Sequence, residues 1–153
     1  MSDWRKDIAN AIADFAAVAE LAGSPLQPGD VTVEFLDAPH RPPKRLPAGK
    51  MAVYGFWHGG EWLKVGKVGS KSQARYVSQH YGLGRALSSL PGSLIKDSRS
   101  SALPGFSPAS AGDWVKAHTN RVNILLPSER GKRLLSLLEA FLHARLEPRY
   151  EGA

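Results

Sequence analysis

Five side chains in the second two-thirds of the chain are of types that could do chemistry together. They are Tyr54, Lys64, Lys67, Arg75 and Glu139. The planar guanidinium group of an arginine can hold a phosphate through two parallel hydrogen bonds, which the ammonium group of a lysine cannot do. A tyrosine phenol titrates at about pH 10, so it needs a nearby cation to act as a base at neutral pH. Taken singly, each residue is more often an ordinary strand or surface residue. Whether the five act together depends on the secondary-structure elements that position them.

The spacing of the residues does not support other common chemical motifs. The five histidines, at positions 40, 58, 80, 118 and 143, form no His-x-x-x-His pair, so we expect no zinc site. The segment GKVGSKS at 66–72 has the composition of a phosphate-binding loop but lacks its Gly-Lys-Ser/Thr ending. The chain has no cysteine, which excludes a disulfide framework, an iron–sulfur cluster and a thiol nucleophile.

Positive charge is concentrated in the later part of the chain. The 153 residues include 20 Lys and Arg against 14 Asp and Glu, which gives a formal net charge of +6. Residues 1–50 sum to −1 and residues 51–153 to +7. This asymmetry predicts a polyanionic partner, most plausibly nucleic acid, although a solubilising surface accounts for it equally well. No apolar run reaches the ~18 residues of a membrane helix and no signal peptide is recognisable, so we expect a cytoplasmic protein without membrane contact.

The first third of the chain contains a helix, a strand and a proline-rich segment. Apolar residues at three- and four-residue steps predict a helix over residues 3–21, and alternation predicts a strand over 31–36. Residues 38–50 contain four prolines among several bases. Proline at this density excludes the interior of a sheet, so the segment is a linker or an extended arm. A plain linker is favoured over an arm along a phosphate backbone.

The remaining elements follow from turn and capping signals. Residues 51–68 predict a β-hairpin around Gly59-Gly60, because paired glycines supply the positive φ values of a tight turn. Ser70 or Ser72 is expected to cap a helix that runs to about residue 81. Residues 82–118 predict a long loop with at most a helical turn or two, and 121–126 a short strand. Ser128 is expected to cap a final helix that runs to about residue 146.

This order of elements predicts an α+β fold, with a small, mostly antiparallel sheet flanked by helices. We divide the chain into two parts. Residues 1–49 form an N-terminal extension with the first helix, the short strand and the proline-rich basic linker. Residues 50–153 form the principal domain, which includes the long loop at 82–118.

The candidate residues occur in an order that resembles the GIY-YIG nuclease family. Ala52-Val53-Tyr54 stands where that family has its first triplet, and Lys64-Val65-Gly66 stands where it has the second. The segment LKVGKVGSKSQARYVSQHYG matches the family's strand, loop and helix with its arginine. LLEAFLHARLEPRYEG resembles the family's last helix, in which a proline follows a glutamate by nine residues. The resemblance covers residues 50–151 and implies a GIY-YIG-like fold.

The resemblance also implies an activity. It implies a metal-dependent endonuclease that hydrolyses phosphodiester bonds in one step by attack of water, with DNA favoured over RNA as the substrate. Glu139 is implied as the only protein ligand of Mg²⁺ or Mn²⁺, because magnesium tolerates one carboxylate plus a substrate phosphate. Arg75 would hold the scissile phosphate, and Tyr54 would orient or deprotonate the attacking water. Lys64 replaces the family's second tyrosine, as in some active branches, and would be the cation beside Tyr54.

Further residues complete the predicted site. Lys67 is expected to contact phosphate or to take the role of Lys64, and His80 to support the phosphate. Nucleic-acid contacts are expected at Lys67, Lys71, Arg75 and Arg85. The chain departs from the family at Lys64 and at Glu151, where an asparagine is frequent. The alternatives are therefore a catalytically inactive nucleic-acid-binding module of the same fold, or a protein-interaction subunit. A homodimer, or a partner protein at the N-terminal region, stays open.

The geometry of the hairpin tests this arrangement. A strict two-residue Gly59-Gly60 loop pairs Tyr54 with Val65 and places Lys64 on the opposite face of the sheet. A three-residue loop, or one bulge, places Tyr54 and Lys64 on the same face. We expect the second geometry.

Overall fold

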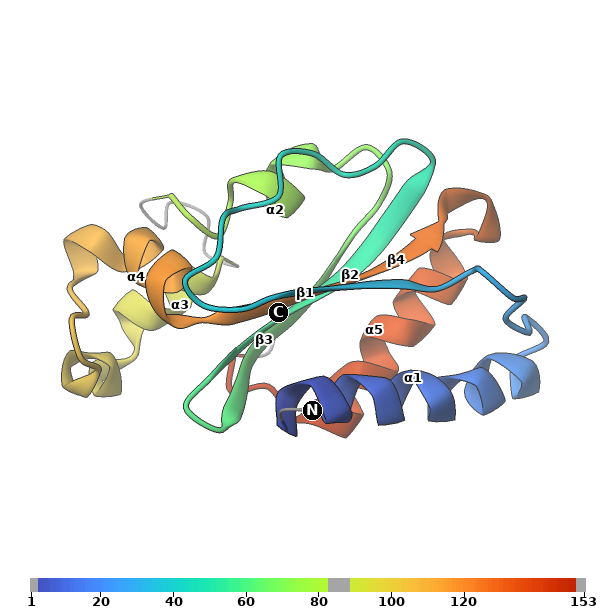
Figure 1. The fold of residues 1–153 in the computed structure, drawn as a ribbon, viewed down its shortest axis with the longest axis horizontal. Coiled ribbons are helices and arrows are strands. Elements are labelled where there is room, and N and C mark those ends of the chain that lie inside the picture. The colour runs from blue at the N-terminus through green and yellow to red at the C-terminus, as the bar shows by residue number, and fades with distance from the viewer. Residues whose placement is uncertain (1–2, 83–88, 151–153) are drawn as a thin grey trace.

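The computed structural model describes residues 3–82 and 89–150. These residues form an α+β fold around one four-stranded antiparallel sheet, as predicted (Figure 1). The strand order is β1-β4-β2-β3, so the strand that comes last in the sequence lies between the N-terminal strand and the hairpin. The elements are α1 (Asp3–Leu21), β1 (Thr32–Leu36), β2 (Lys50–His58), β3 (Glu61–Val68), α2 (Gln73–Val77), α3 (Leu90–Lys96), α4 (Ala111–His118), β4 (Asn120–Pro127) and α5 (Lys132–Leu146).

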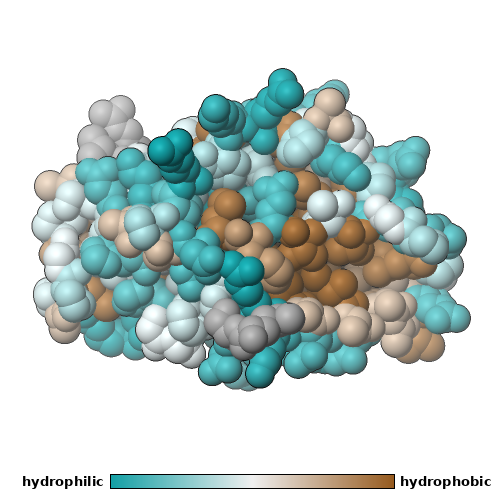
Figure 2. All heavy atoms as spheres, viewed as in Figure 1, coloured by the Kyte–Doolittle hydropathy of each residue, from teal (hydrophilic) through white to brown (hydrophobic). Residues whose placement is uncertain are grey.

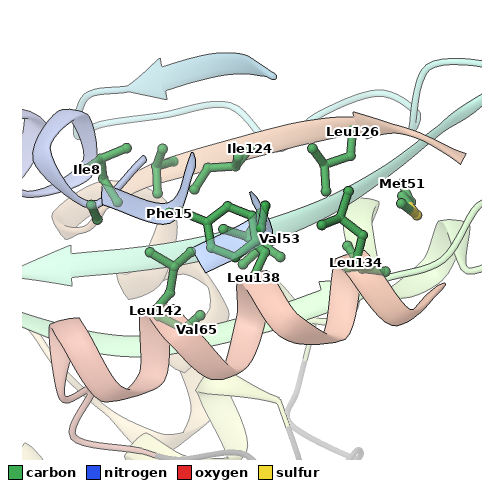
Figure 3. Close-up of a cluster of buried hydrophobic side chains, with 14 of the residues drawn as sticks. Ile8, Phe15, Met51, Val53, Val65, Ile124, Leu126, Leu134, Leu138 and Leu142 are labelled. Carbon is green, nitrogen blue, oxygen red and sulfur yellow. The ribbon is translucent and has the colours of Figure 1, made fainter. Parts of the chain in front are cut away.

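One face of the sheet is covered by α1 and α5. Alternate strand residues such as Met51, Val53 and Ile124 point to this face and pack against the apolar stripes of both helices (Figure 3). On α5 the stripe repeats at the helical period, with Leu134, Leu135, Leu138 and Leu142 buried. This layer is the main hydrophobic core, and it holds α5 in register beneath β2 and β3.

The other face is covered by the short helices α2, α3 and α4. It receives the intervening residues of the central strand β2, which are Ala52, Tyr54 and Phe56. Tyr76 of α2, Leu94 of α3 and Trp114 of α4 close this second cluster. Tyr54 is therefore a buried residue of the layer that carries α2.

The N-terminal region shares the sheet and the core with the rest of the chain. β1 pairs with β4 from Thr32↔Leu125 to Leu36↔Arg121, and α1 packs on α5. Arg130 pairs with Asp30 across the same junction. No helix within residues 3–82 and 89–150 is long and apolar enough to cross a membrane.

Residues 38–49, which we call the proline arm, are packed against the body of the protein (Figure 1). The His40 backbone N–H donates to the carbonyl of Lys116 at 2.9 Å, and the Leu46 side chain is buried in the second cluster. The backbone of Leu46 and the amide of Gln73 exchange two hydrogen bonds, of 2.9 and 3.3 Å. These contacts make the segment an ordered arm beside α2, where the composition favoured a plain linker.

Two of the predicted helices differ from the structure in length or start. The helix expected to reach residue 81 is only α2, Gln73–Val77, and its buried residue is Tyr76, whereas Ala74 is exposed. It ends because the Ser78 hydroxyl and the Gln79 N–H both donate to the carbonyl of Ala74. The last helix starts at Lys132, because Ser128–Arg130 forms a 3₁₀ turn in which the Ser128 hydroxyl donates to Gly49.

The segment expected to be a long loop contains two helices. α3 starts with Ser89 as its N-cap, whose hydroxyl accepts from the Gly92 N–H at 3.1 Å, and Pro91 lies in its first turn. α4 follows two 3₁₀ turns and ends at His118, with Thr119 as its C-cap. The Gly, Ser and Pro residues that suggested a loop are the caps and turns of these short helices.

Candidate active site

The hairpin β2–β3 places Tyr54 and Lys64 on the same face of the sheet. Gly59 and Gly60 form a two-residue turn, both with positive φ, so that His58 lies opposite Glu61. Phe56 pairs with Lys64 and Trp57 with Trp62, which leaves Leu63 as the extra residue of a β-bulge. Beyond the bulge Tyr54 lies opposite Gly66. The expectation of a bulge is confirmed.

Gly66 is the surface on which the Tyr54 ring lies. A Cβ atom at residue 66 would be 2.4 Å from Tyr54 Oη and 2.6 Å from its ring carbon Cζ. No side chain fits there without moving the phenol, so the glycine fixes where the hydroxyl points.

His80 holds the Tyr54 hydroxyl from the other side. The Leu90 backbone N–H donates to His80 Nδ1 at 3.0 Å, so the ring proton is on Nε2. This Nε2–H donates to Tyr54 Oη at 2.8 Å. Burial, helped by the charges of Arg121, Lys64 and Arg75, lowers the pKa of His80 to about 2. His80 is therefore a neutral donor behind Tyr54, where the sequence suggested a contact with phosphate.

Tyr54 stays protonated at neutral pH. Its side chain is 2% exposed, and burial raises its pKa to about 12. Arg75 and Arg121 lower this pKa and Glu139 raises it, but desolvation is the larger effect. The cations that act on Tyr54 are thus two arginines, where the sequence suggested Lys64.

Lys64 lies on the same face of the sheet as Tyr54 and is only 4% exposed. Burial lowers the pKa of its amine and the charge of Arg75 lowers it further, whereas Glu139 raises it. Burial therefore moves the Lys64 amine toward the neutral form and keeps the Tyr54 hydroxyl in the neutral form.

Glu139 and Lys67 meet at the β3 edge of the sheet. Lys67 points to the α5 side of β3, and its Nζ is 3.3 Å from Glu139 Oε1. The same ammonium donates to the Ser136 hydroxyl, one turn earlier on α5, at 3.1 Å. The Glu139 carboxylate is partly exposed and paired with a cation.

Arg75 of α2 adds a positive charge to the candidate site. Its side chain is exposed, and its charge acts on Tyr54, Lys64 and His80. The charges of Arg75 and Glu139 thus act on both Tyr54 and Lys64. Lys71 is exposed in the turn before α2. Arg85 lies outside the described residues.

Sequence reasoning missed Arg121, which is fully buried behind the cluster at 0% exposure. Its guanidinium donates to Asn123 Oδ1 at 2.8 Å, to Tyr81 Oη at 2.9 Å and to the Tyr76 carbonyl at 2.9 Å. It also lies 5.3 Å from the centre of the Tyr54 ring. Within residues 3–82 and 89–150 it forms no ion pair with a carboxylate. The signal in the sequence was Arg121 and Asn123 alternating with the apolar residues of a strand.

A chain of hydrogen bonds links Arg121 to the proline arm. His40 Nδ1–H donates to the Thr119 carbonyl at 2.8 Å, so His40 Nε2 accepts from the Tyr81 hydroxyl at 2.8 Å. Tyr81 in turn accepts from Arg121. Burial lowers the pKa of His40, which keeps the ring neutral and this order of donors intact.

The donor set limits how a divalent cation could bind here. No group of three or more His, Asp or Glu side chains that could enclose a metal ion occurs in the described part of the chain. Glu139 offers one carboxylate, which pairs with Lys67 and acts electrostatically on Lys64. Magnesium accepts a single carboxylate together with waters and a substrate phosphate. Glu139 therefore fits a magnesium ion when a phosphate is present to balance the nearby bases.

The chain matches no protein-family model, no curated protein and no solved structure.

Proposed function

We propose that this protein is a metal-dependent endonuclease, similar to the GIY-YIG nucleases, that hydrolyses phosphodiester bonds in DNA. The observation that carries the proposal is that Tyr54 and Lys64 share one face of the hairpin, and that the charges of Arg75 from α2 and Glu139 from α5 act on both. A phenol, an amine, a guanidinium and one carboxylate in one place are suited to a phosphodiester and a hydrated divalent cation.

In this mechanism Arg75 binds the substrate phosphate and Glu139 binds the metal ion. The exposed Arg75 guanidinium holds the scissile phosphate through two hydrogen bonds. Glu139 holds Mg²⁺ or Mn²⁺, which when bound supplies a Lewis acid beside the phosphate oxygens. Lys67, which pairs with this carboxylate, would be within reach of a phosphate oxygen bound beside it.

Lys64 is the better placed of the two hairpin residues to accept a proton. A general base works best when its pKa is near the working pH, and burial moves the pKa of Lys64 in that direction and that of Tyr54 away from it. Neutral Lys64 Nζ takes the proton of the attacking water as the bond from phosphorus to the 3′ oxygen breaks, and the departing 3′ oxygen takes up a proton from solvent water. Tyr54 Oη, held by His80, orients that water.

Cleavage of supercoiled plasmid tests the proposal. The wild type is expected to nick the plasmid with Mg²⁺ or Mn²⁺ and to lose this activity in EDTA. Glu139→Ala is expected to lower the rate by at least about 100-fold, because it removes the predicted metal ligand. Glu129→Ala, an exposed acid just before α5, is the matched control and is expected to cleave normally. Equal cleavage by both variants would contradict the proposed site.

A binding module without turnover is the second candidate, and the pairing of Lys67 with Glu139 favours it. In that case the lysine permanently occupies the carboxylate, and the basic surface only binds. Lys67→Ala separates the two candidates. For a nuclease it frees Glu139 and lowers the Mg²⁺ concentration needed for half-maximal cleavage. For a binding module no metal concentration gives cleavage, although DNA binding remains sensitive to salt.

A further inference from the structure

The bases of this protein are not spread evenly over its surface. Residues 38–96 contain one acid, Glu61, and it pairs with Arg149 beside the hairpin turn. The same stretch supplies the proline arm, β2, β3 and α2. Within this stretch the positive charge therefore has almost no compensating carboxylate, and Lys67 pairs with Glu139 of α5.

The proline arm carries three of these bases on a fixed backbone. Arg41, Lys44 and Arg45 have exposed side chains, and none of them forms an ion pair with an acid in the described part of the chain. By contrast, Arg130 and Arg145 on the opposite side pair with Asp30 and Asp14. Among the described residues, five arginines outside the arm pair with acids, namely Arg5, Arg99, Arg130, Arg145 and Arg149, whereas those of the arm do not.

The arm lies directly beside the candidate active site. Leu46 is hydrogen-bonded twice to Gln73, two residues before Arg75, and His40 is linked through Tyr81 to Arg121. Strongly hydrophilic side chains line the edge of the molecule over the arm and α2, whereas an apolar area lies between β1 and α1 (Figure 2). The bases of the arm and of α2 therefore belong to one surface.

We propose that the proline arm is a nucleic-acid-binding element, which holds the phosphate backbone beside the phosphate that Arg75 contacts. Its bases act as charges on the backbone, independently of sequence. Because four prolines and the contacts to Gln73 and Lys116 already order the arm, DNA binding costs little conformational entropy there. The inference deepens the proposed function and rests on nucleic acid being the partner, whether or not the site turns over.

The test is the salt dependence of DNA binding, measured in EDTA so that nothing is cleaved. The triple variant Arg41→Gln/Lys44→Gln/Arg45→Gln is compared with Lys6→Gln/Lys96→Gln/Arg145→Gln. Both variants lower the formal net charge from +6 to +3, and all six side chains are exposed. Thermal unfolding confirms that both variants are folded.

The arm variant is expected to bind DNA about tenfold or more weakly at 0.1 M salt, with the slope of log K against log salt reduced by about 2–3. The control triple is expected to change the slope by less than about 1. Equal losses in the two triples would overturn the inference, since net charge alone would then explain them. Normal binding by the arm variant would also overturn it, as would a wild type that binds an acidic peptide but not DNA.

The outcomes for binding and for cleavage are separable. An arm variant that nicks plasmid normally at saturating DNA, but needs more DNA to do so, supports the inference and leaves the active site intact. A wild type that never cleaves, yet shows the difference between the two triples, refutes the nuclease and supports the arm. Cleavage with identical binding of both triples refutes the arm and supports the nuclease.

Discussion

Tyr54 owes its position to two neighbours that the chain supplies from different elements. Gly66 provides a flat backbone surface on one side, and His80 donates a hydrogen bond on the other. Neither neighbour touches substrate in the proposed mechanism. Their role is to hold the phenol in place, and this can be tested without knowing the substrate.

Gly66→Ala is expected to displace the Tyr54 ring. The new methyl group would lie 2.4 Å from Tyr54 Oη, so we expect a loss of about 1–3 kcal/mol in the free energy of unfolding, measured with urea, and a fall in plasmid nicking. Gly69→Ala is the control, because a Cβ there meets nothing within 4 Å. Similar behaviour of the two variants would mean that the phenol does not lie on Gly66.

The pH dependence of cleavage reports on Lys64. If its amine accepts the proton of water, the rate rises with pH until the lysine is fully neutral, and burial brings that limit below the usual lysine pKa. Lys64→Arg keeps the charge but cannot accept a proton, so it should lose the rise and most of the rate. A variant with an unchanged pH profile would exclude Lys64 as the base.

At the scale of elements, the β-bulge makes the two-residue turn compatible with the pairing of Tyr54 and Gly66. Leu63 is the extra residue, and without it the hairpin would be regular with the same pairing of Tyr54 and Gly66. Deleting Leu63 should therefore preserve the cross-strand contact between these residues in NMR spectra. It should also lower the free energy of unfolding by about 1.5–3 kcal/mol, through loss of a buried leucine.

Leu63→Ala is the control for this deletion, because it removes the side chain and keeps the bulge. We expect both variants to lose similar stability and to keep the pairing. If Tyr54 pairs with Val65 in the deletion variant instead, the bulge determines the register of β2 and β3 and is not a consequence of it.

The sequence predicted the elements that are long or have one apolar face. The periodicity of α1 and α5, and the Gly59-Gly60 turn, identify them without tertiary information. It did not predict the true extent of α2, because Ser78 ends that helix through local hydrogen bonds. It also missed α3 and α4, whose seven or eight residues are too few to show a period.

Residues of the candidate site could be predicted where their order along the sequence resembles a known pattern. They could not be predicted where their role depends on tertiary packing. Tyr54, Lys64, Arg75 and Glu139 were singled out from the sequence, and the charges of the last two act on both Tyr54 and Lys64. Arg121 was not, because its role depends on rings and carbonyls that converge only in the fold. The proline arm is likewise ordered by its hydrogen bonds to Gln73, and no pattern in the local sequence marks Gln73 for this role.

At the scale of the whole molecule, two buried neutral histidines make stability depend on pH. The pKa values of His40 and His80 are lower in the folded state than in the unfolded chain, where a histidine titrates at about 6.5. The unfolded chain therefore binds more protons below about pH 6.5, and stability falls as the pH falls. For His80 alone we expect a loss of about 2 kcal/mol between pH 7 and pH 5.

Urea unfolding at the two pH values measures this loss. His80→Gln can still accept from Leu90 and donate to Tyr54, so it should remove about 2 kcal/mol of the difference without unfolding the protein. His118→Gln, an exposed histidine, should leave the difference unchanged. A difference that persists fully in His80→Gln would show that other groups control the acid sensitivity.

The strand order also bears on how the protein is made. The hairpin that carries Tyr54 and Lys64 emerges from the ribosome early, but its neighbour β4 and the helix that carries Glu139 come from the last third of the chain. Pairings between such distant segments form late in folding. A chain that lacks β4 and α5 would thus carry the hairpin without a complete site, so any nuclease activity would begin only after α5 has been made.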